Sequence, residues 1–274
     1  MPLARLNGIS ISYQVEGQGE PLVMIMGFTA SRIGWMPQRR FFKRYYRVIT
    51  FDNRGAGKSD KPPVSYSTRM MADDTVKLMD VLGIEKAHIM GLSMGGMIAQ
   101  ELAINYPQRV VKLVLVATYT RQDEISGDTL EQAKFLHLSP EKKINAMIGL
   151  AFNKPLYRFT VGLLARAQAG FRGVSSKVGI AGQSEACQKH DTLERLSSIT
   201  APTLVIVGTG DRIINPVSSE VIAGKIPNAK LVKVDGASHY FSFEMKNVFN
   251  REVLNFLKSN SPGTDRLNTW NTTA

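Results

Sequence analysis

The chain has 274 residues, of which 43% are hydrophobic and 21% are charged, and its formal net charge is +11. This composition is ordinary for a folded globular protein and excludes a mainly disordered chain. The longest apolar runs are strand-sized, far below the roughly 18 residues of a membrane-spanning helix, so we expect no stable membrane insertion. The length corresponds to one large domain or two small ones.

Two features favour a reducing, intracellular setting. Cys187 is the only cysteine, which excludes an intrachain disulfide and a zinc site built from cysteines. The amino terminus, MPLARLNGISISYQVEG, has no apolar run followed by a small-residue cleavage site, so no secretory signal is predicted. We therefore expect a cytoplasmic protein.

The predicted elements alternate regularly along the chain. Residues 3–15 alternate around turn residues, which predicts an antiparallel hairpin. Continuous apolar runs, as buried parallel strands require, cover residues 21–27, 47–52, 86–92, 110–118, 202–210 and 230–236. Helical patterns cover residues 70–83, 93–107 and 246–258. This order predicts an α/β fold with a mostly parallel twisted sheet and helices on both faces.

Residues 121–198 break this rhythm. The segment is helix-like in pieces, contains several glycines and has no clear strand. Because it lies between two sheet strands, we expect an inserted helical cap or lid, with residues 1–120 and 199–260 forming the core. The polar tail, residues 261–274, is expected to be disordered.

The positive charge is concentrated in the run RRFFKRYYR, residues 39–47. On a helix, Arg39, Lys43 and Arg47 would form one stripe, with the aromatic residues elsewhere. We interpret the run as a solvated face of an amphipathic helix whose aromatic side chains pack inward. No nucleic-acid motif accompanies it, so we expect no nucleic-acid partner.

A nucleophile motif, G-x-S-x-G, spans Gly91 to Gly95 with Ser93 at its centre. It follows the apolar run KAHIM and opens a helical pattern, the context that makes the motif informative. A sharp strand-to-helix turn forces the serine into strained backbone angles, and side chains two residues before and after it would collide. The free N–H groups of the helix start favour a developing anion there.

A serine hydroxyl needs a base. Of the four histidines, His88 lies in a predicted buried strand, and His137 and His190 lie in the insertion without a recognisable partner. His239 follows the last strand, at the carboxyl edge where open α/β sheets bind ligands. We therefore predict His239 as the base.

The base in turn needs a carboxylate that orients it. Asp211 directly follows the strand LVIVGTG and is the preferred candidate. Asp235 is too close in sequence to reach across the imidazole of His239, and Asp52 is interpreted as holding a loop by hydrogen bonds. The order serine, aspartate, histidine is the one that this fold class uses.

Together these motifs resemble the α/β-hydrolase superfamily, in its alpha/beta hydrolase-1 branch of esterase- and lipase-like enzymes. The resemblance rests on GLSMGG at the elbow, FDNRGAGKSD after the second parallel strand, VGTGDRIINP around the acid and GASHY around the base. It covers about residues 10–120 and 199–258. It implies the α/β-hydrolase fold with a variable cap, the triad Ser93, Asp211 and His239, and no cofactor.

The resemblance also implies an oxyanion hole made of two backbone N–H groups. One belongs to Met94, after the nucleophile, and the other to Phe28, in the loop MGFTAS after the first parallel strand. The family usually has His-Gly in that loop, whereas this chain has Met26-Gly27. Backbone donors tolerate this change, because an N–H group does not depend on the preceding side chain.

Several other classes are disfavoured by single residues. Epoxide hydrolases and haloalkane dehalogenases resemble this fold but need aspartate at position 93, and dienelactone hydrolases need cysteine there. A P-loop would need glycine in place of Asp52, and a dinucleotide fingerprint would need glycine in place of Ile213. No H-x-x-H motif or carboxylate cluster suggests a metal, so we expect none.

We expect a carboxylesterase that acts on short- to medium-chain acyl esters. An apolar pocket would be lined by Leu138, Phe152 and Leu163 of the insertion and by Trp35 and Tyr240 near the catalytic loops. Perhydrolases, carbon–carbon bond hydrolases, lactonases and acyltransferases have a similar triad, and fold analogy does not separate them. A hydrolase-fold ligand receptor with slow turnover is the alternative from another class.

Overall fold

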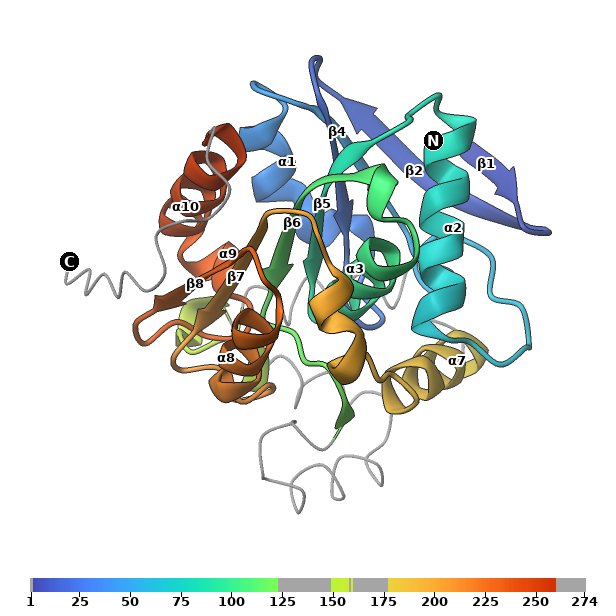
Figure 1. Ribbon diagram of the computed structural model, residues 1–274. Helices are drawn as coiled ribbons and strands as arrows, with labels where there is room; N and C mark the ends of the chain where they lie inside the picture. The colour runs from blue at the N-terminus through green and yellow to red at the C-terminus, as the bar shows by residue number, and fades with distance from the viewer. Residues whose placement is uncertain (1, 123–148, 158, 160–176, 260–274) are drawn as a thin grey trace.

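A computed structural model describes residues 2–122, 149–157, 159 and 177–259. Its centre is a sheet of eight strands in the order β1-β2-β4-β3-β5-β6-β7-β8 (Figure 1). The strands are β1 (Leu3–Leu6), β2 (Ile9–Glu16), β3 (Pro21–Ile25), β4 (Arg47–Phe51), β5 (Ala87–Leu92), β6 (Val110–Val116), β7 (Thr203–Gly208) and β8 (Ala229–Val234). β1 and β2 lie in the alternating segment that predicts a hairpin, and each of the other strands overlaps a continuous apolar run of the sequence.

The sheet is antiparallel at one end and parallel elsewhere. β1 and β2 form the predicted hairpin, and β2 also pairs antiparallel with β4. All pairs from β4 through β3 to β8 are parallel. The predicted mostly parallel sheet is therefore confirmed. Its parallel strands end at one common edge, which is where a ligand site is expected in such sheets.

Helices cover both faces of the sheet (Figure 1). On one face lie α2 (Thr68–Val81), α3 (Met94–Asn105) and α8 (Pro216–Lys225). On the other face lie α1 (Met36–Phe42), α9 (Phe241–Glu244) and α10 (Lys246–Lys258). Within the described ranges, three short 3-10 helices, η1 (Arg32–Trp35), η2 (Pro107–Arg109) and η4 (Leu193–Ser198), join other elements. The prediction of helices on both faces is confirmed.

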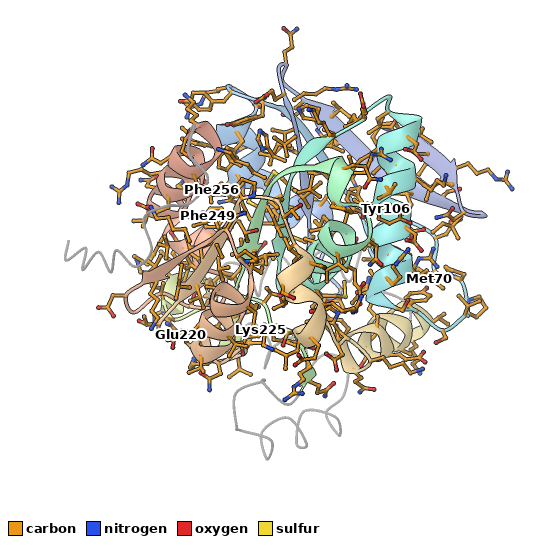
Figure 2. All side chains as sticks on the ribbon, in the orientation of Figure 1. Met70, Tyr106, Glu220, Lys225, Phe249 and Phe256 are labelled. Atoms are coloured by element: carbon orange, nitrogen blue, oxygen red, sulfur yellow. The ribbon has the colours of Figure 1, made fainter. Side chains whose placement is uncertain are left out.

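Two apolar layers hold the helices to the sheet. Alternate side chains of each central strand point to opposite faces, so Val23 and Ile89 join the layer under α2 and α3, while Met24 and Met90 join the layer under α1 and α10. Figure 2 labels Phe249 and Phe256 of α10, whose buried side chains complete the second layer. The continuous apolar runs of the sequence reflect this burial on both faces.

Local signals set the ends of α2. The hydroxyl of Ser67 accepts the N–H of Met70 at 3.0 Å and caps the first turn. Gly83 follows the helix with φ +65°, the left-handed conformation that a helix-ending glycine adopts readily. Gly83 is also the last residue of the predicted helical pattern, and the helix begins two residues earlier than that pattern indicates.

The prediction of one helix through the basic run 39–47 is wrong. α1 ends at Phe42, and Arg47 is the first residue of β4. The residues after Arg47, Val-Ile-Thr-Phe, favour a strand, and this preference outweighs the helical spacing of the cations. Two of these cations pair with a carboxylate: Arg39 and Lys43 lie 3.3 and 3.1 Å from Glu16. Phe42 and Tyr46 are buried as predicted, whereas Tyr45 is exposed.

Part of the predicted cap lies within the described residues. Arg121 and Asp191 form an isolated antiparallel bridge, so the two ends of the insertion lie side by side. Before the second end, α7 (Lys177–Gln188) runs below α2 (Figure 1). Most of residues 123–176, and the tail 261–274, lie outside the described residues, so the cap and tail boundaries stay predictions. No helix of the described ranges is long and apolar enough to cross a bilayer.

Candidate active site

Four loops at the carboxyl edge of the parallel strands carry the predicted site residues. Phe28 follows β3, Ser93 follows β5, Asp211 follows β7, and His239 follows β8. In sheet order, β3 and β5 are neighbours and β7 and β8 are neighbours, with β6 between the two pairs. The topology therefore brings residues from four distant parts of the chain to one edge.

Ser93 occupies a strained turn between β5 and α3. Its backbone angles are φ 55° and ψ −122°, a region that a non-glycine residue adopts only at a cost of about 1–3 kcal/mol. Its N–H donates to Val116 O at 2.9 Å, and the hydroxyl of Thr118 donates to Ser93 O at 2.9 Å. These two bonds, to the last residue of β6 and to a residue just after it, fix the turn. The strained backbone angles are those that the motif predicts.

Three glycines leave room for this turn. A Cβ atom on Gly91 would overlap the carbonyl of Gly95, and a Cβ on Gly95 would overlap the carbonyl of Ile25 in β3. On Gly96, a Cβ would lie 2.6 Å from the Cβ of Thr118. The predicted steric reason for glycine at positions 91 and 95 is confirmed. Position 96 also has no room for a side chain.

The predicted base and acid lie in direct contact. His239 Nδ1 is 2.7 Å from Asp211 Oδ2, and both side chains are almost completely buried. Asp211 Oδ1 accepts the N–H groups of Ile213 and Ile214 at 2.8 and 3.0 Å. All three bonds suit an ionised carboxylate, which only accepts. Holding the proton on Nδ1 leaves the lone pair of Nε2 as the basic position of the ring.

The segment around His239 is tied to the loop that follows β3. The hydroxyl of Tyr240 donates to Gly34 O at 2.8 Å and lies 3.9 Å from Met26 Sδ. This hydrogen bond holds the segment of His239 next to the loop after β3. Gly27 of the same loop packs against Ser93. Among the described residues, no hydrogen bond joins Ser93 to His239. The hydrogen bond between a nucleophile and its base is often long in free enzymes and shortens when substrate binds.

Glu244 and Asn153 also hold the acid and base loops. The carboxylate of Glu244 accepts the hydroxyl of Ser238. It also accepts the backbone N–H of Asn153 at 3.2 Å and that of Lys154 at 2.7 Å. The side-chain amide of Asn153 donates to Gly210 O and Gly236 O at 3.3 and 3.2 Å. Neither residue can be recognised from the sequence, because no local pattern distinguishes a buried polar side chain from an exposed one.

The loop after β3 approaches the nucleophile closely. A Cβ atom on Gly27 would lie 3.2 Å from both Leu92 O and Ser93 Cβ. Among the described residues, the N–H groups of Phe28 and Met94 find no acceptor. Met94 is the first residue of α3, where N–H groups are free to bind an anion. The two predicted oxyanion donors therefore lie beside Ser93, Phe28 in the loop after β3 and Met94 at the start of α3.

Met26 has a packing role in this loop. Its side chain is buried, and its sulfur and terminal methyl would each lie 3.0 Å from a Cβ on Gly34. Its carbonyl accepts the side-chain amide of Asn53 at 2.8 Å, which orients the chain just before Gly27. The side chain of Met26 therefore packs against Tyr240, and the contact that orients the loop is made by the backbone carbonyl of Met26.

The other described histidines are separate from this cluster. His88 is buried in β5, as predicted, and burial lowers the pKa of its imidazole. His190 is also buried, and its Nδ1 lies 2.9 Å from the hydroxyl of Thr68. Burial lowers the pKa of His190 to about 3, so its ring is neutral near pH 7. His137 lies outside the described residues.

The rejected carboxylates have other partners. Asp52 accepts the N–H groups of Arg32 and Lys58 at 2.8 and 2.9 Å and pairs with the Arg32 guanidinium at 2.5 Å. This confirms its predicted loop-holding role. Asp235 accepts the hydroxyl of Thr209 at 3.0 Å. Within the described ranges, no group of three His, Cys, Asp or Glu side chains could hold a metal.

The predicted pocket residues have different environments. Trp35 is fully buried and stacks on Phe249 at 6.5 Å between ring centroids, so its burial is explained by the core rather than by a pocket. Phe152 packs edge-on against Tyr240 at 5.3 Å, and Phe243 joins them. Tyr240 directly follows His239 in the chain, and the rings of Phe152 and Phe243 pack against the ring of Tyr240. Leu138 and Leu163 lie outside the described residues.

A mostly parallel sheet with a strained serine between strand and helix, and an aspartate–histidine pair at the same edge, defines the class of α/β-hydrolase folds. The sequence profile described as the alpha/beta hydrolase fold matches residues 20–245. The chain belongs to this family.

Known proteins of similar sequence and structure cover nearly the whole chain. A protein of Azorhizobium caulinodans, provisionally named carbamate hydrolase RutD, is 29% identical over 93% of this chain and 98% of its own. A hydrolase from Pseudomonas aeruginosa superposes with TM-score 0.82 at 29% identity, covering 94% and 98% of the two chains. The enol-lactonase from Burkholderia xenovorans has TM-score 0.83 at 26% identity, covering 94% and 100%.

Proposed function

We propose that this protein is a serine hydrolase that cleaves carboxylic esters with short to medium acyl chains. In this proposal Ser93, His239 and Asp211 form the catalytic triad, and the N–H groups of Phe28 and Met94 form the oxyanion hole. The observation that carries the proposal is the 2.7 Å contact between His239 Nδ1 and Asp211 Oδ2. It leaves Nε2 as the proton acceptor for a serine held in a strained elbow at the same sheet edge.

Acylation follows from these roles. The hydroxyl oxygen of Ser93 attacks the ester carbonyl carbon while His239 Nε2 takes the hydroxyl proton. The carbonyl π electrons move to oxygen, and the N–H groups of Phe28 and Met94 donate to this oxyanion; each such donor typically contributes on the order of 3 kcal/mol. The carbon–oxygen bond to the alcohol then breaks, His239 gives its proton to the leaving oxygen, and an acyl group remains on Ser93.

Deacylation repeats these steps with water. His239 Nε2 takes a proton from water, and the resulting hydroxide attacks the acyl carbon. The same oxyanion donors bind the second tetrahedral intermediate. When it collapses, His239 returns the proton to the Ser93 oxygen, and the carboxylic acid leaves. Asp211 stays ionised throughout and stabilises the charged imidazole. The cycle requires no cofactor.

The acyl preference is tested with p-nitrophenyl esters from acetate to palmitate. Tyr240 follows the base in the chain, and Phe152 and Phe243 pack on its ring. An apolar wall of this kind next to the base would favour an uncharged acyl group of limited length. We expect kcat/KM to peak between acetate and octanoate and to be at least about tenfold lower for palmitate, a difference of roughly 1.4 kcal/mol.

Ser93→Ala protein serves as the blank in this series. Subtracting its rate corrects for spontaneous hydrolysis and for any non-specific reaction with lysine side chains. A maximum at palmitate would overturn the acyl preference. Rates equal to the blank for every ester would overturn the assignment to ester hydrolysis.

A second candidate is lactone hydrolysis, favoured by the similarity to the enol-lactonase over nearly the whole chain. A lactone is a cyclic ester, so the same triad would open it, and the leaving alcohol would stay attached to the acyl group. Simple lactones are therefore measured beside the linear esters. N-alkyl carbamates are measured as well, because of the similarity to the protein named carbamate hydrolase RutD. A kcat/KM for either class about tenfold above the best linear ester would move the assignment to that class.

A further inference from the structure

The loop that carries Phe28 is held by a side chain from α7, more than 150 residues away in sequence. Gln183 is fully buried, and its Oε1 accepts the N–H of Thr29 at 2.7 Å. Its Nε2 donates to Arg54 O at 2.7 Å. Because one end of the amide accepts and the other donates, these two bonds define a single orientation of the side chain.

Thr29 is the residue in this loop that needs support. It has φ +57°, a left-handed conformation that is unfavourable for a β-branched residue. It is the third residue of a tight turn that is closed by the N–H of Ala30 donating to Gly27 O at 3.3 Å. A turn with positive φ at this position favours glycine. Without an outside contact, the turn would relieve this strain by changing its backbone angles.

The approach of α7 to this region depends on two glycines. A Cβ atom on Gly179 would overlap the carbonyl of Gly55, so the two backbones are in contact. A Cβ on Gly182 would lie 2.6 Å from the ring of Tyr66. The missing side chains let the helix sit close enough for the short reach of Gln183 to span the distance to Thr29.

We propose that Gln183 is a positioning residue for the oxyanion hole. By fixing the N–H of Thr29, it keeps the Gly27–Ala30 turn in the form that presents the Phe28 N–H to the carbonyl oxygen at Ser93. The N–H of Thr29 is then committed to Gln183, which leaves Phe28 and Met94 as the two oxyanion donors. This inference rests on the proposed function, because it needs Ser93 to be the nucleophile.

The test uses the rate at which a fluorophosphonate labels Ser93, measured by mass spectrometry, together with kcat and KM for p-nitrophenyl butyrate. Labelling builds negative charge on the phosphoryl oxygen, so it reports the oxyanion hole without requiring the natural substrate. We expect Gln183→Ala to lower the labelling rate and kcat by about 10- to 100-fold, less than the complete loss of a donor. KM is expected to change less than about twofold, because the donors act mainly in the transition state.

Rescue by Thr29→Gly distinguishes positioning from general stability. Glycine adopts positive φ without strain, so the turn no longer depends on the bond from Gln183. The double variant Thr29→Gly/Gln183→Ala is expected to label at least about tenfold faster than Gln183→Ala, and to differ from Thr29→Gly alone by less than about threefold. Gln183→Met, which keeps the side-chain volume, is measured in parallel in case the alanine variant folds poorly.

Gln100→Ala is the matched control. Gln100 is equally buried, donates to Tyr119 O at 3.0 Å and accepts the hydroxyl of Thr192 at 2.6 Å, without touching the Gly27–Ala30 turn. Its labelling rate is expected within about threefold of wild type at a similar loss of Tm. Equal effects of Gln183→Ala and Gln100→Ala, or a loss that Thr29→Gly does not restore, would overturn the positioning role. Absence of label on Ser93 in the wild type would instead overturn the proposed function, and this inference with it.

Discussion

Ser93→Ala is expected to lower kcat for ester hydrolysis by about 10⁴- to 10⁶-fold, the range found when a triad nucleophile is removed. Alanine cannot form the acyl-enzyme, and the oxyanion donors alone give only a small rate above that of water. Its Cβ is that of serine, so the strained backbone at φ 55° stays unchanged. The measurement is kcat with the best p-nitrophenyl ester, beside Tm to show that the fold is intact.

Two controls make this result specific. Ser198→Ala removes an exposed hydroxyl that donates to Arg195 O at 2.7 Å, and it should keep wild-type kcat. Ser93→Gly should lose the same activity as Ser93→Ala but gain about 1 kcal/mol of unfolding free energy, because glycine relieves the positive φ. Ester turnover by Ser93→Ala within about tenfold of wild type would exclude Ser93 as the nucleophile.

Asp211→Asn is expected to lower kcat by about 10⁴-fold with little change in fold. The N–H groups of Ile213 and Ile214 both donate to Oδ1, so the asparagine must keep its oxygen at that position. Its amide nitrogen then replaces Oδ2 opposite His239 Nδ1. Two donors cannot face each other there, so the imidazole proton moves to Nε2, and the base loses the lone pair that accepts the serine proton.

Asp235→Asn is the matched control for this variant. Asp235 lies four residues before His239 and accepts the exposed hydroxyl of Thr209, but it does not contact the imidazole. Its kcat should stay within about threefold of wild type. If Asp235→Asn lost activity as strongly as Asp211→Asn, the acid of the proposed triad would have been assigned to the wrong residue.

The sheet and the site loops could be predicted from sequence because each depends on local patterns. Strands buried on both faces are continuous apolar runs, and each candidate residue directly follows such a run or a turn after it. The elbow is recognisable because its strain requires glycine at positions 91 and 95. The preference for Asp211 over Asp52 and Asp235 depended on position relative to the strand ends, and the described contacts agree with it.

The basic run could not be predicted by helical spacing alone. Arg39, Lys43 and Arg47 fit a helical stripe, but the β-branched residues after Arg47 pair with β2 and β3. The strand pairing is a tertiary contact that the period of the charges does not contain. Trp35 was assigned to the pocket from its position near the catalytic loops, but its ring packs against Phe249 in α10.

The supports of the site could not be predicted for a related reason. Gln183 reaches Thr29, and Asn153 reaches Gly210, across separations that only the folded chain brings together. Neither Gln183 nor Asn153 belongs to a motif, and glutamine and asparagine are common on protein surfaces. Their importance comes from burial and from the particular backbone groups that they bind, which one sequence does not reveal.

Trapping the acyl-enzyme tests the central claim most directly. The protein is mixed with p-nitrophenyl acetate, quenched in acid during turnover, digested, and analysed by mass spectrometry. We expect one added acetyl group on the peptide that contains Ser93, with fragment ions that place it on the serine, and none on this peptide in Ser93→Ala. Turnover without an adduct on this peptide, or with an equally fast adduct on another side chain, would contradict it.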